Sequence, residues 1–213
     1  MMAVALTGNA AAGKSTVAGI WAAKGIPVVR ADDLAREAVA PGSEGLAEVV
    51  AAFGSGILRA DGSLDRGALR GRVFKDQRER ARLEEILHPR IGELRDRWMA
   101  LKREGGALLA VAEIPLLFEV GLEDDYDAVV CVDAPEELRL ERLVKERGLE
   151  EEEARRVISS QLPSPEKRRR SHFVLDNDGS REELLERSLA LLNLLRARAL
   201  AKASRQSAKG GAS

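Results

Sequence analysis

Gly8 to Thr16 reads GNAAAGKST and begins two residues after the apolar run from Ala3 to Leu6. This stretch matches the G-x-x-x-x-G-K-[ST] motif of a phosphate-binding P-loop. In that motif the glycines let backbone N–H groups turn toward an anion, the lysine reaches the β- and γ-phosphates, and the first hydroxyl binds Mg²⁺. An apolar strand before the motif and a helical pattern after it, which Gly25 ends, favour this interpretation over a glycine-rich turn that binds nothing.

Four further short apolar segments are candidate strands, and helical stretches separate them: residues 27–29, 108–112, 128–132 and 173–175. This alternation predicts an α/β fold with a parallel five-stranded sheet flanked by helices on both faces. Ligands of such sheets bind beyond the carboxyl ends of the strands. We therefore expect the P-loop and the residues after Val29, Ala112 and Val132 to converge on one cleft.

The chain has 213 residues, of which 45% are hydrophobic, and this size suits one core with a small appended region. Nearly eighty residues without a strand separate the second and third strands, which is too long for a simple crossover. They predict a helical insertion that binds a second substrate. The charged helical stretch before the last strand is interrupted at Gly148 and at Pro163, and predicts a basic lid. We expect a single domain over residues 1–200, with its core at 1–32, 105–135 and 172–200, the insertion at about 33–104 and the lid at about 136–171.

The last helix is expected to begin at a capping box formed by Ser180 and Glu183 and to continue to about Leu200. The remaining residues, 201–213, are small or basic and include no acidic residue. This composition predicts a disordered basic tail.

Composition limits the classes of partner. Lysine plus arginine and aspartate plus glutamate nearly cancel, to a formal net charge of -1, so nothing global indicates nucleic acid or an anionic membrane as a partner. The sequence has no run long and apolar enough to span a membrane, and it enters the first strand without a signal peptide pattern. We expect a cytoplasmic protein. Cys131 is the only cysteine and lies in an apolar strand, so we expect it to pack in the core.

Asp32 and Asp33 directly follow the second predicted strand, at the sheet edge expected beside Lys14. A kinase must orient an acceptor hydroxyl in line with the γ-phosphate, and a carboxylate can fix that hydroxyl and accept its proton. Aspartate also commonly caps a helix. Position and residue type leave both roles open.

Glu113 ends the third predicted strand, where an acidic residue can hold Mg²⁺ directly or through water. It could instead cap the turn before Pro115. A group of cations lies farther along the chain and could clamp a transferring phosphate: Arg139, Arg142, Lys145, Arg147 and residues 167–170. Glutamates alternate with the first of these cations, however, so the group could also be a solvent-exposed helix face held together by salt bridges.

His88 precedes Pro89, where a helix is expected to break. It is either a structural residue or a substrate contact. Asn177 follows the last strand and is followed by Asp178 and a glycine, which is typical of a turn, although the same edge could face a nucleotide base. We assign no chemistry to His172.

Several segments together resemble the dephospho-coenzyme A kinase family, in order and in spacing. They are the P-loop, ADDLAR at 31–36, FG at 53–54, DGSLDR at 61–66, LHP at 87–89, IPLLFE at 114–119, Arg142 with Leu143, Gln161, and NDGS at 177–180. The resemblance covers residues 3–195. It is much more specific than the P-loop alone, which indicates only a phosphate.

The resemblance implies ATP-dependent phosphorylation of the ribose 3′-hydroxyl of dephospho-coenzyme A, the last step of coenzyme A biosynthesis. It implies a small-molecule acceptor, ATP as co-substrate and Mg²⁺ as cofactor. Catalytic roles fall on Asp32, Lys14 and Arg142, and Asp33 falls on a variable position. The nucleotide-binding residues are Gly8, Ala11, Ala12, Gly13, Lys14, Ser15, Thr16 and Asn177, with Ser15 as the metal ligand. The acceptor-binding residues are Asp32, Arg36, His88 and Leu116.

The chain departs from the family pattern at four positions. Arg30 replaces a usual aspartate, Asn9 and Ala11 replace P-loop glycines, and His172 replaces an aspartate. None of these changes removes a group that phosphoryl transfer requires. A kinase of another small molecule, such as a nucleotide or nucleoside, is the alternative enzyme. A nucleotide-dependent switch is a third reading, but no Asn-Lys-x-Asp guanine motif follows the P-loop.

Overall fold

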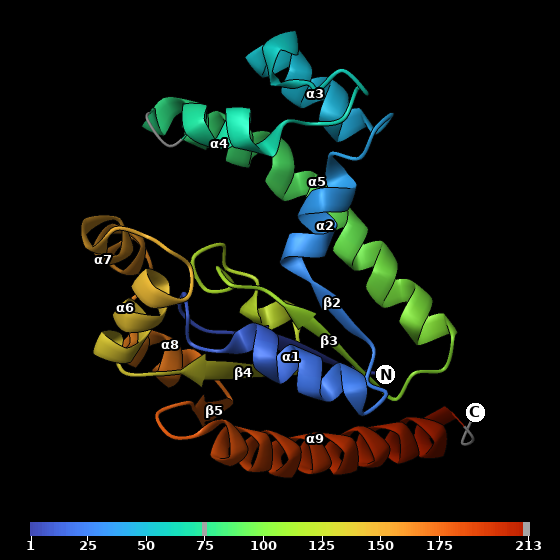
Figure 1. Ribbon diagram of the computed structural model, residues 1–213. Coiled ribbons are helices and arrows are strands. Elements are labelled where there is room, and N and C mark those ends of the chain that lie inside the picture. The colour runs from blue at the N-terminus through green and yellow to red at the C-terminus, as the bar shows by residue number, and fades with distance from the viewer. Residues whose placement is uncertain (74–75, 211–213) are drawn as a thin grey trace. The chain divides into compact units, whose positions relative to one another are not determined.

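The structure is a computed structural model that describes residues 1–73 and 76–210 (Figure 1). The chain forms two compact units, one of Met1–Val28 together with the residues from Leu101 onward, and one of Val29–Ala100. The sequence placed the insertion at about 33–104. The compact second unit begins at Val29, inside a strand, and ends at Ala100, inside a helix.

The sheet confirms the five strands expected from the apolar segments. They are β1 (Met2–Thr7), β2 (Val28–Arg30), β3 (Leu109–Glu113), β4 (Ala128–Asp133) and β5 (Phe173–Asp176), in the order β2-β3-β1-β4-β5. The pairs β1–β3, β1–β4 and β4–β5 are parallel. All the residues of β1, β3 and β4 are buried, which explains why these strands are continuously apolar rather than alternating.

Two helices cover one face of this sheet: α1 (Lys14–Ala23) and α9 (Arg181–Gly210), which lie side by side (Figure 1). Val130 and Val132 of β4 pack with them in one apolar cluster, together with Trp21 of α1, which is fully buried. Trp21 Nε1 donates a hydrogen bond to the Ser188 carbonyl, 3.1 Å away, and so joins α1 to α9. The P-loop helix is therefore anchored on the main core.

Successive strand residues point to opposite faces, so Cys131 of β4 lies on the face opposite Val130 and Val132. Helix α8 (Ser164–Arg170) contacts β4. Burial raises the pKa of the Cys131 thiol to about 11, which suits an unreactive packing residue. Two more helices, α6 (Glu136–Lys145) and α7 (Glu151–Ser159), form the rest of the segment expected to be the lid, and η2 (Glu123–Asp125) precedes β4.

The second unit is helical, as the strand-free stretch predicted. It contains α2 (Ala31–Ala38), α3 (Glu44–Phe53), η1 (Ser55–Ile57), α4 (Arg66–Val73) and most of α5 (Gln77–Glu104). Its own apolar core centres on Val49, Phe53 and Leu69. It therefore has its own hydrophobic basis for folding, separate from the sheet.

The expected helix break before Pro89 is wrong, because α5 continues through Pro89. A proline removes one backbone hydrogen bond, but tertiary contacts on both sides hold this helix together. Ile86 and Leu87 pack against the core of the second unit, and Arg90 pairs with Glu44 and with a second glutamate of α3. These contacts outweigh the local preference of the sequence.

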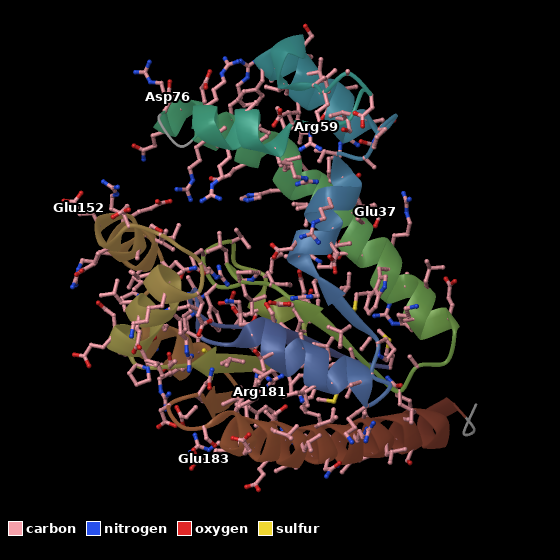
Figure 2. The ribbon with its side chains drawn as sticks, in the orientation of Figure 1. Glu37, Arg59, Asp76, Glu152, Arg181 and Glu183 are labelled. Atoms are coloured by element: carbon pink, nitrogen blue, oxygen red, sulfur yellow. The ribbon has the colours of Figure 1, made fainter. Side chains whose placement is uncertain are left out.

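The expected disorder of the tail is also wrong for residues 201–210, which continue α9 to Gly210, while residues 211–213 lie outside the described part. Alanine, lysine, arginine and glutamine are good helix formers, so a small, basic composition does not by itself end a helix. Lys202 of this extension pairs with Asp127. The capping box is confirmed at the other end of α9, where Ser180 and Glu183 exchange hydrogen bonds. Figure 2 labels Glu183 at this end of the helix. In the described residues, no helix is both long and apolar enough to cross a membrane.

Candidate active site around the P-loop

The two P-loop glycines meet both a conformational and a steric requirement. Gly8 has φ 138° and Gly13 has φ 103°, values that L side chains rarely adopt. A Cβ on Gly8 would lie 2.0 Å from the Val132 carbonyl oxygen, and one on Gly13 would lie 2.3 Å from Asn177 Nδ2. The loop can therefore pass close to β4 and to Asn177 only with glycine at these positions.

Asn177 holds the P-loop from the end of β5. Its Nδ2 donates to the Ala12 carbonyl at 2.8 Å, and its backbone N–H donates to the Asp133 carbonyl at 2.7 Å. The side chain is buried between these contacts. Asn177 therefore does more than form the turn that the sequence pattern suggested: its side chain also bonds to the backbone of the P-loop.

Lys14 is buried at the start of α1, and its Nζ donates to the Asn9 carbonyl at 2.9 Å. The pKa of Lys14 is lowered to about 8: burial is the largest cause, the Glu113 carboxylate opposes it, and the positive charges of Lys167 and Arg147 add to the lowering. A phosphate beside Nζ would favour the charged lysine. The site is thus built to gain electrostatic stabilisation when an anion binds.

Ser15 and Glu113 form the candidate metal position. Ser15 Oγ donates to Glu113 Oε1 at 3.1 Å, and Glu113 is buried at the end of β3. Hydroxyl and carboxylate oxygens suit Mg²⁺, which usually takes only one or two protein ligands and fills its other positions with water and phosphate oxygens. The donor set therefore fits Mg²⁺ bound together with a nucleotide.

A cavity of about 530 Å³ lies over this loop. It brings together most of the residues expected to bind the nucleotide: Ala11, Gly13, Lys14, Ser15, Thr16 and Asn177. Arg142 and Arg147 line it too. Gly8 and Ala12 lie outside the lining, where they form the buried base of the loop. This cavity is the candidate nucleotide site.

Arg142 of α6 reaches the P-loop from the lid segment. Its Nη1 donates to the Ala11 carbonyl at 3.1 Å, and its Nη2 donates to the Asn177 carbonyl at 3.3 Å. The guanidinium therefore joins the P-loop to the β5–α9 turn at the wall of the cavity. Of the cations that the sequence left as candidates for a phosphate clamp, Arg142 and Arg147 line this cavity.

Most of the other cations of the two clusters are engaged with acidic groups or with backbone carbonyls. Lys145 pairs with Glu141 at 2.7 Å on the surface, and Arg169 pairs with Glu166. Arg139 is buried, and its Nε donates to the Ala134 carbonyl. These residues form salt bridges on the surface or pack inside the protein, which is the alternative that the sequence left open for them.

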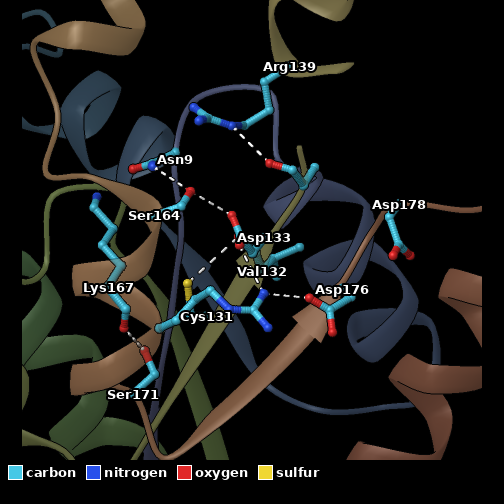
Figure 3. A network of polar contacts seen from close by, with 12 residues as sticks. Asn9, Cys131, Val132, Asp133, Arg139, Ser164, Lys167, Ser171, Asp176 and Asp178 are labelled. Atoms are coloured by element: carbon cyan, nitrogen blue, oxygen red, sulfur yellow. Dashed lines mark hydrogen bonds and ion pairs between the residues drawn. The ribbon is translucent and has the colours of Figure 1, made fainter. Parts of the chain in front are cut away.

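A polar network supports the P-loop behind Asn9 (Figure 3). Asn9 Nδ2 donates to Ser164 Oγ at 3.1 Å, and Ser164 Oγ donates to Asp133 Oδ1 at 2.7 Å. Arg168 pairs with Asp133 and Asp176 at the ends of β4 and β5. The polar side chain of Asn9, which departs from the usual glycine, is thus bound to the start of α8.

Lys167 and Gln161 are structural contributors to this site that sequence motifs alone do not reveal. Lys167 is fully buried, and its Nζ lies 2.8 Å from Glu119 Oε1 and donates to the Pro115 carbonyl at 3.2 Å. Gln161 Oε1 accepts from the Ala10 N–H at 2.7 Å. The only signal for Gln161 was its place in the family pattern, because its partner lies about 150 residues away.

The expected acceptor-binding residues lie in both units. Leu116 is half-buried in the loop after β3, in the first unit. The second unit contains Asp32 and Arg36 on α2 and His88 on α5, and all three are exposed. Asp32 and Asp33 occupy the first turn of α2, where no side-chain hydrogen bond caps the helix, and Asp33 pairs with Arg36 at 2.9 Å.

Comparisons with known proteins identify the family of this chain. Residues 2–183 match the family model described as dephospho-CoA kinase. A dephospho-CoA kinase of Anaeromyxobacter dehalogenans is 47% identical over 92% of this chain and 93% of that protein. One from Thermobifida fusca is 44% identical over 86% of this chain and 91% of that protein.

Solved structures give the same result. A crystal structure of a Thermus thermophilus protein has a TM-score of 0.73 and 36% identity, covering 91% of this chain and 96% of that one. Dephospho-CoA kinase from Campylobacter jejuni has a TM-score of 0.68 and 26% identity, covering 92% of this chain and 97% of that one. The parallel sheet with its P-loop is thus a P-loop kinase fold, and the chain belongs to the dephospho-CoA kinase family.

Proposed function

We propose that this protein transfers the γ-phosphoryl group of ATP to the ribose 3′-hydroxyl of dephospho-coenzyme A, giving coenzyme A and ADP. Family membership over most of the chain supports the reaction. The observation that carries it at the site is the cavity that joins Lys14, Ser15 and Arg142 over the P-loop. The reaction is the last step of coenzyme A biosynthesis, and we place it in the cytoplasm.

The P-loop binds the phosphates of ATP in this proposal. Its backbone N–H groups and Lys14 Nζ hold the β- and γ-phosphates, and the positive end of α1 adds to the attraction. Ser15 would hold Mg²⁺, with Glu113 beside it. When bound, Mg²⁺ would neutralise charge on the phosphate oxygens and orient them. Lys14, released from the Asn9 carbonyl, then pairs with phosphate.

Asp32 acts as the base toward the acceptor. The 3′-hydroxyl oxygen attacks the γ-phosphorus, the bond from that phosphorus to the ADP oxygen breaks, and Asp32 takes the hydroxyl proton. Arg142 stabilises the charge that spreads over the transferring group. Arg36, His88 and Leu116 bind the acceptor. The exposed position of Asp32 on α2 leaves its carboxylate accessible to a substrate.

A coupled assay of ADP release tests the proposed reaction. Purified protein is supplied with Mg²⁺ and ATP, and dephospho-coenzyme A is compared with adenosine, AMP and no acceptor. We expect rapid ADP formation only with dephospho-coenzyme A, and a product whose mass and mobility match coenzyme A. Faster turnover with AMP or adenosine would instead assign the protein to the alternative class of nucleotide or nucleoside kinases.

A further inference from the structure

Ala11 has a backbone conformation that is unusual for its residue type. Its φ is 58°, and among the residues that the structure describes it is the only non-glycine with a positive φ. The left-handed region brings the Cβ of an L-residue close to the following carbonyl, whereas glycine adopts it freely. A methyl group at this position therefore needs a contact that compensates for the strain.

The structure provides such a contact on the lid segment. Helices α6 and α7 form a small apolar cluster around Leu143, Ala154 and Ile158, and both Ala10 and Ala11 pack against it. Ala11 is half-buried, so its methyl group is partly removed from water by this packing. Removing this Cβ would relieve the strain and also remove apolar contact between the P-loop and the two helices.

Two hydrogen bonds flank the alanine pair and lead to the same segment. Arg142 of α6 donates to the Ala11 carbonyl, and Gln161, just after α7, accepts from the Ala10 N–H at 2.7 Å. Apolar packing and polar contacts thus join the phosphate loop to the last turn of α6 and to the residues just after α7. All these residues belong to the first compact unit.

We propose that Ala11 is a positioning residue that docks the α6–α7 pair onto the phosphate loop, so that the lid and the loop move together. The methyl group acts through the helices that carry Arg142 and Gln161. In the reaction proposed above, on which this step rests, docking keeps Arg142 at the nucleotide cavity and keeps water away from the γ-phosphate. A glycine at this position would leave the loop intact and the lid less firmly held.

The first test uses limited trypsin digestion of the nucleotide-free protein and does not depend on activity. Arg155 and Arg156 lie exposed on α7, so cleavage there reports opening of the lid segment. We expect Ala11→Gly to raise the cleavage rate at these sites about fourfold, the effect expected from losing one buried methyl contact. Ala11→Ser keeps the Cβ and should keep the slow cleavage.

Two further variants separate docking from general destabilisation. Ala190→Gly changes an exposed alanine of α9 and lowers helix stability away from the lid, so it should leave cleavage on α7 unchanged. Ile158→Val removes a methyl group from the lid side of the cluster. Combined with Ala11→Gly, it should add little to the effect of either change alone, because both weaken the same contact. Independent, fully additive effects would contradict docking, as would an unchanged cleavage rate in Ala11→Gly.

Kinetics give the second test. The ratio of ATP hydrolysis without acceptor to phosphoryl transfer should rise about threefold or more in Ala11→Gly, because a loosely held lid admits water. An unchanged ratio would overturn the proposal. If the wild-type protein transfers no phosphate to dephospho-coenzyme A, the proposed function fails, while the digestion experiment still decides whether Ala11 docks the lid.

Discussion

Ser15 Oγ donates a hydrogen bond to Glu113 Oε1 at 3.1 Å, and this bond joins the residue after the P-loop lysine to the end of β3. Both groups can serve as oxygen ligands: Ser15 lies in the first turn of α1, the helix that follows β1, and Glu113 ends β3, which pairs with β1. The sequence left Glu113 between a metal-linked role and a cap of the turn before Pro115. Its buried carboxylate faces the hydroxyl expected to bind Mg²⁺.

Glu113→Gln should weaken the binding of Mg²⁺ at the active site without unfolding the protein. Glutamine retains the shape and can accept the Ser15 hydrogen bond, but it removes the negative charge that attracts the cation. We expect turnover to fall at least about tenfold and the Mg²⁺ concentration for half-maximal activity to rise. The measurement is a Mg²⁺ titration of ADP release. Glu141→Gln, at an exposed ion pair on α6, is the control, and identical Mg²⁺ curves for wild type and Glu113→Gln would exclude the role.

Lys14 should make stability depend on pH in a direction opposite to that of an ion-paired surface lysine such as Lys145, whose pKa is raised by its hydrogen bond to Glu141. Its pKa is lowered to about 8 by burial, against 10.5 for an ordinary lysine. Between these pH values the unfolded chain binds more protons than the folded one. The free energy of unfolding of the nucleotide-free protein therefore increases as the pH rises. Below about pH 8 both states are protonated, and this contribution no longer changes.

The measurement is urea unfolding of wild type and Lys14→Met across this pH range. The free energy of unfolding of wild type, minus that of the variant, should increase from about pH 8 toward 10.5 by a few kcal/mol at most. Taking the difference cancels the titration of the other groups. A difference that stays flat or falls over this interval would mean that burial does not depress the pKa of Lys14.

Asp32→Asn should abolish most of the turnover while ATP still binds. An amide cannot accept the hydroxyl proton, and positioned bases contribute about 10²-fold to 10⁴-fold to such reactions. Asp33→Asn is a matched control, because Asp33 is the next residue on α2 and pairs with Arg36 on the surface. Steady-state kinetics and ATP titrations check both variants. If the two variants lose equal activity, the loss comes from a change in the charge or folding of α2, and Asp32 is not the base.

Lys167 and Glu119 should be strongly coupled in stability. The Lys167 ammonium is fully buried and lies 2.8 Å from Oε1 of Glu119, whose side chain is 19% exposed. Removing one partner leaves a buried charge without compensation, so Lys167→Met should lower the free energy of unfolding by about 3 kcal/mol. Lys167→Met combined with Glu119→Gln should recover part of that loss. Chemical denaturation of the four proteins gives the coupling energy, and simple additivity would show that the pair is not coupled.

The sequence predicted the sheet and the phosphate loop because their signals are local. Each strand is a short buried run, and the P-loop motif is contiguous, so neither depends on knowing a distant partner. The support of the loop is different. Ala10 bonds to Gln161 and Ala11 to Arg142, residues that lie more than 130 positions away and carry no local signal for these contacts. Only the fold brings them together.

Tertiary packing also explains why two predictions based on local sequence were wrong. Residues 201–210 were expected to be disordered, yet they extend a helix that is already formed and packed, so no new nucleation is needed. Pro89 was expected to break α5, yet Ile86 and Leu87 before it pack against the core of the second unit, and Arg90 after it pairs with glutamates of α3. In both cases a neighbouring structure compensates for a weak local preference.

Pro89→Ala should therefore stabilise the second unit. Because α5 already continues through this position, alanine would restore a backbone N–H that can bond within the helix and would remove the clash of the proline ring with the preceding turn. We expect the free energy of unfolding to rise by about 1–3 kcal/mol. Gly92→Ala, at another position inside α5, is a comparison that changes only helix propensity, and its gain should stay near 1 kcal/mol. Urea denaturation followed by circular dichroism measures both variants. A destabilised Pro89→Ala would mean that the ring itself makes a contact that the helix requires.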